Sequence, residues 1–121
     1  ADPLDERELA ETLRAKVETL RVVFPLFQCL AKKEVARGRF LEAAAAWHGH
    51  VLRPLVTLLR IRWSPARHDF GFRLIHEDLP AAVLDELRPL AWPAGPESLE
   101  KLLPAAEAHF DRTLRSLELD R

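Results

Sequence analysis

The chain has 121 residues, a formal net charge of −1 and a hydrophobic fraction of 48%. This length is typical of one domain with a self-sufficient core, and the apolar content excludes a wholly disordered chain. The near-neutral balance excludes a strongly polyanion-binding chain on global charge, although it leaves room for a local basic patch. The acidic, polar start is not typical of a signal peptide, so we expect none at this start, and the lack of any run of 18 apolar residues argues against a transmembrane helix.

The cysteine and methionine contents bear on compartment and completeness. One cysteine, Cys29, excludes an intrachain disulfide and a cysteine-based zinc site. Cys29 lies in an apolar stretch, so we expect a buried and unreactive thiol, and a reducing cytoplasm is the simplest compartment. The sequence contains no methionine, so we expect residues 1–121 to be a single bundle domain from a longer or processed protein.

The composition favours an all-α fold. Leu, Ala, Arg and Glu are abundant, and all four are good helix formers. The first helix is predicted from about Asp5 to Arg37, because its apolar residues recur every three to four positions. Pro25 lies inside this pattern and either kinks one helix or divides it into two.

The second predicted helix runs from about Phe40 to Trp63 and carries two apolar stripes, so we expect it to be the central helix. One stripe contains Phe40, Ala44, Trp47, Val51, Leu55, Leu58 and Ile61, and the other contains Leu41, Ala45, Leu52, Val56 and Leu59. Gly49 and Pro54 weaken or bend this helix, and Ser64-Pro65 ends it.

The second half of the chain predicts two more helices. Residues 66–77 form an ordered loop, and a short third helix follows over about 80–90 with Asp78 as its N-cap. Residues 91–96 are rich in Pro and Gly, which indicates a linker. The last helix is predicted over about 97–119, and Pro104 is a point at which its first turn can separate. Together these elements predict an antiparallel four- to five-helix bundle with a structured loop between the second and third main helices.

The charge pattern singles out one basic region. No acidic residue occurs between Glu42 and Asp69. The basic residues in this stretch are His48, His50, Arg53, Arg60, Arg62, Arg67 and His68. Arginine donates two parallel hydrogen bonds to phosphate or carboxylate, so the region predicts an anion site near the C-terminal end of the second helix. The alternative is that these arginines pair with the acidic first and last helices.

Residues 67–73, Arg-His-Asp-Phe-Gly-Phe-Arg, are the most distinctive stretch. Long ordered loops are commonly functional or tightly pinned, and the sequence leaves both alternatives open. In the second case Phe70 and Phe72 plug the bundle while Gly71 allows the turn. Asp69 is placed to hold a neighbouring His68 or Arg67 by a charge-assisted hydrogen bond.

Catalytic and metal-binding motifs are weak. His48 and His50 are two residues apart, so in a regular helix they point to different faces and cannot chelate one metal. The serines lack a nucleophile-elbow context, and four scattered glycines cannot form a phosphate loop. We therefore assign no catalytic residue, no metal and no cofactor.

Three stretches resemble one family. Residues 47–60 are similar to a helix in the C-terminal helical domain of aminoglycoside-nucleotidyltransferase-like proteins, a bundle related to HEPN domains. Residues 64–73 and Asp78-Leu79-Pro80 resemble the loop and helix start that follow, so the resemblance covers about residues 24–117. In that family an N-terminal α/β domain carries a Gly-Ser motif and paired aspartates, and the helical domain helps to hold the acceptor substrate. This chain departs from the family because it contains no Gly-Ser pair and no Asp-x-Asp.

The resemblance implies a C-terminal fragment that serves as a substrate-binding or accessory domain of a nucleotidyltransferase-like protein. Its partner would be a nucleotidyltransferase catalytic domain in cis or in trans, and its ligand a nucleotide or a small cationic substrate. The residues expected to line the ligand face are Arg60, Arg62, Arg67, His68, Asp69 and Arg73. The arginines would neutralise phosphate, and Asp69 would orient a neighbour or bind a cationic acceptor.

Two alternatives come from other classes of protein. Arg62 and His68 match the Arg-x(4–6)-His spacing of HEPN endoribonucleases, which would make them a catalytic pair, although Trp63 and Pro65 depart from that family's pattern. The second alternative is a helical protein-interaction or antitoxin-like module, including a homodimer. Its sign would be an exposed apolar patch, for which Trp92 and its prolines are a candidate.

Overall fold

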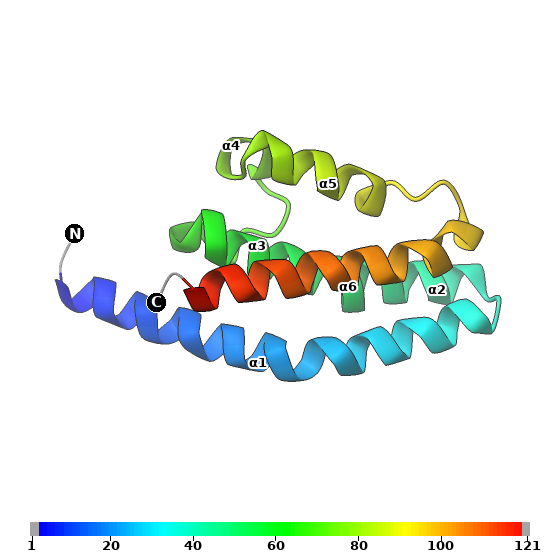
Figure 1. Cartoon of the computed structure of the whole chain (residues 1–121), viewed down its shortest axis with the longest axis horizontal. Helices are drawn as coiled ribbons and strands as arrows, with labels where there is room; N and C mark the ends of the chain where they lie inside the picture. Colours follow the sequence, from blue (N-terminus) through cyan, green and yellow to red (C-terminus); the bar gives the residue numbers. More distant parts are fainter. Residues whose placement is uncertain (1–2, 120–121) are drawn as a thin grey trace.

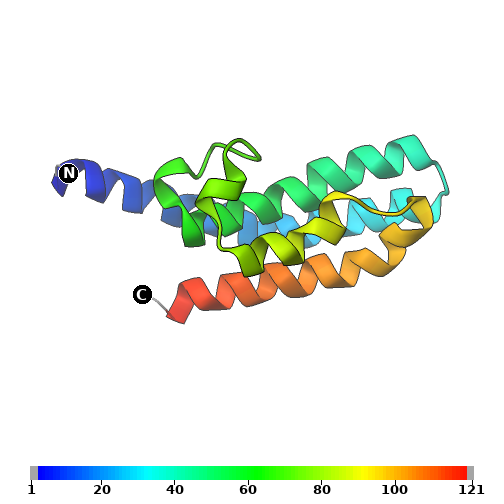
Figure 2. The ribbon, with the colours of Figure 1, turned by 90° about the horizontal axis from the view of Figure 1, so that it is seen from above.

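Helices that alternate in direction make up the computed structural model, which describes the backbone of residues 3–119 and the side chains of residues 3–118. In chain order, the main elements are α1 (Pro3–Ala36), α2 (Phe40–Ala46), the π-helical segment η1 (Trp47–Leu52), α3 (Arg53–Trp63), α5 (Ala81–Ala91) and α6 (Pro96–Leu119). Because α2, η1 and α3 follow without a break, they form one rod. Figures 1 and 2 show α1, this rod and α6 side by side, with the shorter α5 over one side. The predicted all-α bundle is confirmed.

Helix α1 is one unbroken element in spite of Pro25. A proline in a helix interior removes one backbone hydrogen bond and crowds the carbonyl four residues earlier, which bends the helix. Figure 1 shows α1 changing direction near its middle. The residues that α1 buries on one face are Val17, Phe24, Gln28 and Ala31. Cys29 lies about 100° round the helix from Gln28 and is exposed, so the prediction of a buried thiol is wrong.

The rod over residues 40–63 is the central element of the core, as its apolar content predicts. Its side chains with at most 1% exposure include Trp47, Val51, Leu52, Leu55, Val56, Leu58 and Leu59. The Trp47 indole also donates a hydrogen bond of 2.8 Å to the backbone carbonyl of Leu90, which fixes α5 against the rod. Helix α3 ends before Ser64-Pro65, as predicted.

The rod changes helical register at η1. There the Arg53 N–H bonds to the carbonyl of His48, five residues back rather than four. This wider turn directly precedes Pro54, which has no N–H and would crowd the carbonyl of His50 in a regular α-helix. The predicted weakening of the helix at Pro54 therefore takes the form of a π-helical segment instead of a break.

The register change moves the buried face of α2 by one residue. Ala43 and Ala46 are buried, whereas Ala44 of the predicted stripe is exposed. Phe40 and Leu41, also predicted to face the core, are 60% and 68% exposed. A π turn uses about one residue more than an α turn. The predicted stripe has one constant helical period through α2 and α3, so in α2 it names Ala44 where the structure buries Ala43. The predicted stripes are therefore wrong in α2.

Helix α6 closes the core against α1. The Phe110 ring stacks on Phe24, with the ring centroids 3.8 Å apart and the planes within 2°. The apolar residues that this helix buries are Leu99, Leu103, Ala106 and Phe110. Pro104 lies inside α6 without separating its first turn. Near the C-terminal end, Arg21 and Glu118 form an ion pair of 2.5 Å that links α1 to α6.

Residues 64–80 connect α3 to α5 through two short turns of helix, η2 (Pro65–Arg67) and α4 (Ile75–Asp78). Helix α4 replaces the last part of the predicted loop, and Leu74 before it has a left-handed backbone with a φ of +59°. Asp78 ends α4, while the N-cap position of α5 is Pro80, which supplies no side-chain cap. The predicted capping role of Asp78 is therefore wrong.

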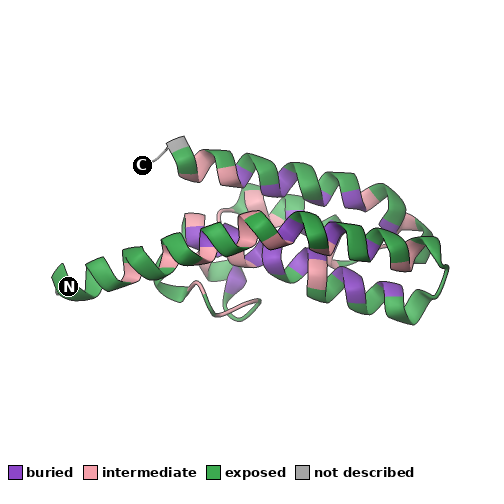
Figure 3. Cartoon of the chain, turned by 90° about the horizontal axis from the view of Figure 1, so that it is seen from below, coloured by how far each residue is buried: buried purple, intermediate pink, exposed green. Residues whose placement is uncertain are grey.

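Exposed residues lie along the outer surfaces of the bundle. Figure 3 shows exposed residues along the outer side of α1, whose N-terminal part extends beyond the end of α6, while buried residues gather where the helices meet. Within residues 3–119, no helix combines the length and the apolar character that crossing a membrane requires.

A buried histidine predicts how stability depends on pH. His109 on α6 is 6% exposed, and its Nε2 atom lies 3.6 Å from the Glu86 carboxylate. Burial lowers the pKa of His109 below its ordinary value of 6.5; Glu86 opposes this shift and Arg112 adds to it. The unfolded chain therefore binds a proton at this site more readily than the folded chain does. Stability is highest above pH 6.5 and falls as the pH drops below it, by at most about 1.4 kcal/mol per pH unit for one group.

Thermal unfolding between pH 7.5 and 5 measures this dependence. We expect His109→Gln to show a shallower loss of melting temperature on acidification than the wild type. The exposed His76→Gln is the matched control and should keep the wild-type slope. An unchanged slope in His109→Gln would mean that other groups cause the acid sensitivity.

Candidate ligand site beside the 64–80 connection

A buried guanidinium, that of Arg60 at the end of α3, organises the connection. Arg60 is 0% exposed. Its Nε donates to the Gly71 carbonyl at 2.7 Å, and its Nη2 donates to the Arg73 carbonyl. Its Nη1 donates to Asp78 Oδ2 at 2.6 Å and to Ser64 Oγ at 3.2 Å. A charge buried in a protein is tolerated only when it is paired and hydrogen-bonded, and here the connection supplies all of these partners.

Asp78 also pairs with a second arginine, Arg67, which lies in the connection itself. Arg67 Nη1 donates to Asp78 Oδ1 at 3.0 Å, so that each oxygen of the carboxylate faces a different guanidinium. The side chain of Asp78 is 10% exposed, whereas that of Arg67 is 44% exposed. The Arg60–Asp78 pair is therefore the buried part of this network, and Arg67 covers it from the solvent side.

Three guanidiniums also surround the ring of Phe70. The Cζ atom of Arg73 lies 4.9 Å from the ring centroid, and those of Arg60 and Arg67 lie 5.7 Å from it. Cations over an aromatic face are attracted by its quadrupole. Phe70 is half-buried and Phe72 is 48% exposed, so neither ring is a plug deep in the bundle. The connection is held in place by contacts with arginine side chains, which is the second of the two predicted alternatives.

A cavity of about 560 Å³ lies between α1, α3 and the pinned connection. Its lining residues are Lys16, Arg53, Val56, Thr57, His68, Asp69, Phe70, Gly71 and Phe72. Helix α1 supplies Lys16, helix α3 supplies Arg53, and the connection supplies His68 and Asp69. This volume lies within the range of ordinary small-molecule sites.

One wall of the cavity is a lysine–histidine contact. Lys16 Nζ lies 2.6 Å from His68 Nδ1. A lysine ammonium has only donors, so the Nδ1 atom of His68 accepts this hydrogen bond. The neutral ring then carries its hydrogen on Nε2, which leaves Nε2 as a donor. The contact therefore leaves His68 Nε2 as a hydrogen-bond donor close to the Lys16 ammonium.

The charges at the cavity are not balanced. Lys16 and Arg53 bring two positive charges and Asp69 brings one negative charge. Within residues 3–118, neither the Arg53 guanidinium nor the Asp69 carboxylate has an ion-pair partner. Both side chains are exposed, whereas Lys16 and His68 are half-buried. The cavity therefore offers donors and excess positive charge to an anionic group, and one free carboxylate to a donor on the same ligand.

The residues predicted from sequence divide into three groups. His68 and Asp69 line the cavity. Arg60 is buried behind the connection, and Arg67 and Arg73 stack on Phe70, so none of these three lines the cavity. Arg62 stacks on Trp63, with its Cζ atom 4.2 Å from the ring centroid, and it is also absent from the cavity lining.

Two predicted pairings in this region are corrected. Asp69 holds neither His68 nor Arg67, because Lys16 bonds to the histidine and Asp78 pairs with the arginine. The alternative that the arginines pair with the first and last helices is contradicted for Arg60 and Arg67. Among the described residues, Arg60 and Arg67 find their carboxylate partner in Asp78.

Sequence reasoning missed Lys16, Arg53 and Thr57 as lining residues. Lys16 interrupts the apolar stripe of α1, since it lies three residues after Leu13 and four before Leu20. A charge at such a position points toward the bundle, and this was the available signal. Arg53 belongs to the acid-free stretch, but it lies 15 residues before His68 in the sequence. The two residues line one cavity because the connection folds back beside α3, and the sequence does not show this path.

The histidines do not gather into a metal site. His48 is exposed, and the ring of His50 lies 4.7 Å from that of Phe27. Within the part of the chain that the structure describes, no group of three or more His, Cys, Asp or Glu side chains could hold a metal ion.

Comparisons of the chain with protein-family models, with curated proteins and with solved structures found no match.

The buried ion pair predicts a large stability difference between neighbouring arginines. Arg60→Met leaves Asp78 without its buried partner, and we expect it to lower the free energy of unfolding by about 3–5 kcal/mol. Asp78→Asn should cost a similar amount, because it leaves the Arg60 charge uncompensated. Arg67→Gln is the control, since a half-exposed pair contributes at most about 1 kcal/mol. Urea denaturation measures all three, and equal stability of Arg60→Met and wild type would contradict the assignment.

Proposed function

We propose that this chain is a substrate-binding accessory domain that holds the phosphate of a nucleotide in the cavity between α1, α3 and the connection. The supporting observation is the unbalanced positive charge of Lys16 and Arg53 beside the His68 donor. We further propose that it works with a nucleotidyltransferase-type catalytic domain, in cis or in trans. This part of the proposal rests on the resemblance of residues 47–60, 64–73 and 78–80 to the helical domain of that family.

Each lining residue has a distinct task in this proposal. Arg53 presents a planar fork that donates two parallel hydrogen bonds to a phosphate. Lys16 adds a compact positive charge, and His68 Nε2 adds a neutral donor. Asp69 accepts a hydrogen bond from a hydroxyl or amino group of the same ligand. Arg60 acts as a positioning residue, because its hydrogen bond to the Gly71 carbonyl fixes the cavity wall.

Arg62 and His68, the two residues of the ribonuclease alternative, have different surroundings among the described residues. His68 is engaged by Lys16 through Nδ1, and Arg62 lies against Trp63, outside the cavity that His68 lines. We therefore propose a binding function for this surface and not a catalytic pair.

Binding of ATP with Mg²⁺, and of inorganic phosphate, tests the site. A ligand present at 100 times its Kd stabilises the fold by about 2.7 kcal/mol, which a thermal-shift titration detects as several degrees. We expect Arg53→Ala and Lys16→Ala to abolish the shift. Their controls are Arg115→Ala and Lys32→Ala, which remove the same charges from exposed positions outside the cavity. No shift with either ligand, or an equal loss in the controls, would contradict the site.

Asp69 separates an anionic ligand from a cationic one. Asp69→Asn removes a negative charge from the cavity, so a phosphate ligand should bind roughly threefold to tenfold more tightly. A cationic aminoglycoside such as kanamycin should instead bind more weakly to this variant. Isothermal titration of both ligands against wild type and Asp69→Asn gives the two changes directly. Tighter binding of the aminoglycoside to Asp69→Asn would exclude a role of this carboxylate in holding a cation.

The gene that encodes the chain tests the second part of the proposal. A Gly-Ser motif followed by an Asp-x-Asp stretch is expected upstream in the same reading frame or in an adjacent one. Without such a stretch, the link to a nucleotidyltransferase is lost, and only the binding experiments bear on the proposed ligand site.

A further inference from the structure

The outer side of α1 carries an exposed apolar stripe. Val22, Leu26 and Leu30 are 64%, 61% and 46% exposed. Their spacing of four residues places them along one face of the helix. Pro25 and Cys29 lie beside them and are also exposed. We call these five residues the α1 stripe, and none of them carries a charge.

The α1 stripe is separate from the face that α1 turns to the core. Phe24 and Ala31, which the bundle buries, lie about 140–160° round the helix from Leu26, at about 100° per residue. Helix α1 is therefore apolar on two opposite sides, of which the bundle covers one. Single exposed apolar residues are ordinary, but a contiguous patch marks an interaction surface. Figure 3 shows this outer side of α1 uncovered by any other element.

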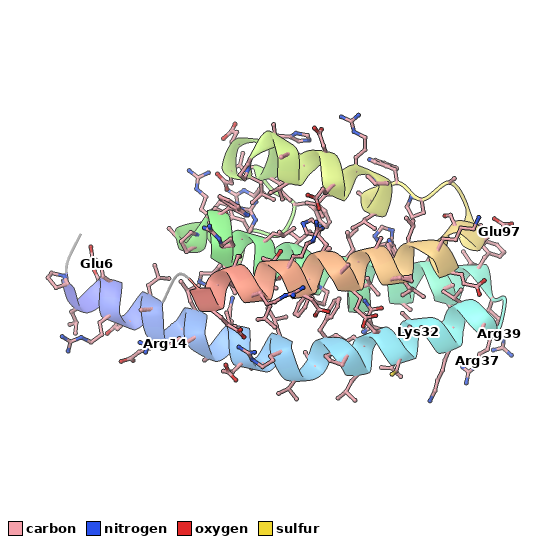
Figure 4. The ribbon with its side chains drawn as sticks, in the orientation of Figure 1. Glu6, Arg14, Lys32, Arg37, Arg39 and Glu97 are labelled. Carbon is pink, nitrogen blue, oxygen red and sulfur yellow. The ribbon has the colours of Figure 1, made fainter. Side chains whose placement is uncertain are left out.

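The charges at the two ends of the α1 stripe have opposite signs. Glu11 and Glu18 precede it, and Lys33 and Arg37 follow it, on the same side of the helix. All four are exposed. Figure 4 shows Arg37 at the C-terminal end of α1. The outer side thus runs from acidic through apolar to basic along about 40 Å of helix, at about 1.5 Å per residue.

We propose that the α1 stripe binds the α1 stripe of a second copy of this chain, with the two helices antiparallel. A two-fold axis at Leu26 brings Val22 of one copy against Leu30 of the other. Glu18 lies eight residues before the axis and Lys33 seven after it, so these opposite charges meet twice. A parallel pair would instead align Glu18 with Glu18 and Lys33 with Lys33. The surface is therefore complementary to itself in one orientation, which is what a closed two-fold dimer requires.

This dimer is independent of the proposed ligand site. Lys16 lies about 80° round α1 from Leu26, toward the cavity and away from the α1 stripe. The cavity residues on α3 and on the connection belong to other elements. Two copies joined through α1 therefore keep both cavities open, and variants of the stripe leave the ligand-binding residues unchanged.

Sedimentation equilibrium of the purified chain over about 1–100 μM, under reducing conditions, tests the dimer. We expect the mass of two chains at high concentration. Leu26→Lys should raise the dimer Kd at least about tenfold, because a charge replaces the centre of the apolar contact. Leu41→Lys is the matched control, since Leu41 is 68% exposed on α2, and it should dimerise like the wild type. Circular dichroism should show both variants folded, because both positions are exposed.

A charge exchange tests the orientation. Glu18→Lys and Lys33→Glu should each weaken the dimer, and the double variant should recover the wild-type Kd, because the two charges then meet again with their signs exchanged. A chain that stays monomeric at 100 μM would overturn the proposal and leave the α1 stripe to a different partner. A dimer that Leu26→Lys leaves intact, or that Leu41→Lys disrupts equally, would overturn it as well. Failure of the double variant to recover would exclude the antiparallel arrangement.

Discussion

A single buried guanidinium determines the path of the chain between the second and third main helices. Arg60 reaches the core because it lies in the last turn of a helix that is buried on nearly every side. Once enclosed, its charge must be met by acceptors, and Ser64, Gly71, Arg73 and Asp78 provide them. The path of the connection therefore follows from the hydrogen bonds that the buried Arg60 charge requires, and not from burial of Phe70 and Phe72.

The same buried charge bears on the proposed ligand site. A loop that is to bind phosphate oxygens, as we propose, needs its backbone fixed before the ligand arrives, since ordering it on binding costs affinity. The hydrogen bond from Arg60 to Gly71 fixes the backbone between His68 and Phe72. Lys16 then fixes the His68 ring from the other side, through a contact between residues 52 positions apart in the sequence. Both supports come from helices, so the cavity is built on rigid elements.

The helices and their limits follow from the sequence, because the 3.6-residue period of α1, α3 and α6 reflects a constant geometry. The prediction is wrong where that geometry changes, as in α2, whose buried face η1 displaces by one residue. The acid-free stretch marks a basic region, but it does not distinguish Arg60, which is buried, from Arg53, which lines the cavity. That distinction depends on where Asp78 lies, and the spacing of 18 residues along an irregular connection does not reveal it. Lys16 could be recognised only as a charge on an apolar stripe.

The π-helical segment has a consequence for how this protein tolerates change in its chain length. A segment with a wide turn accommodates one residue more than a regular helix of the same rise, so it takes up the difference locally. The side chains of α2 face the core with one offset and those of α3 with another, and the two offsets meet within Trp47–Leu52. We therefore expect a deletion of one residue in α2 (Phe40–Ala46) to be taken up there, without rotating Arg60 away from its acceptors. The segment thus separates α2, in which the chain length can change, from α3, which carries Arg60 and Arg53.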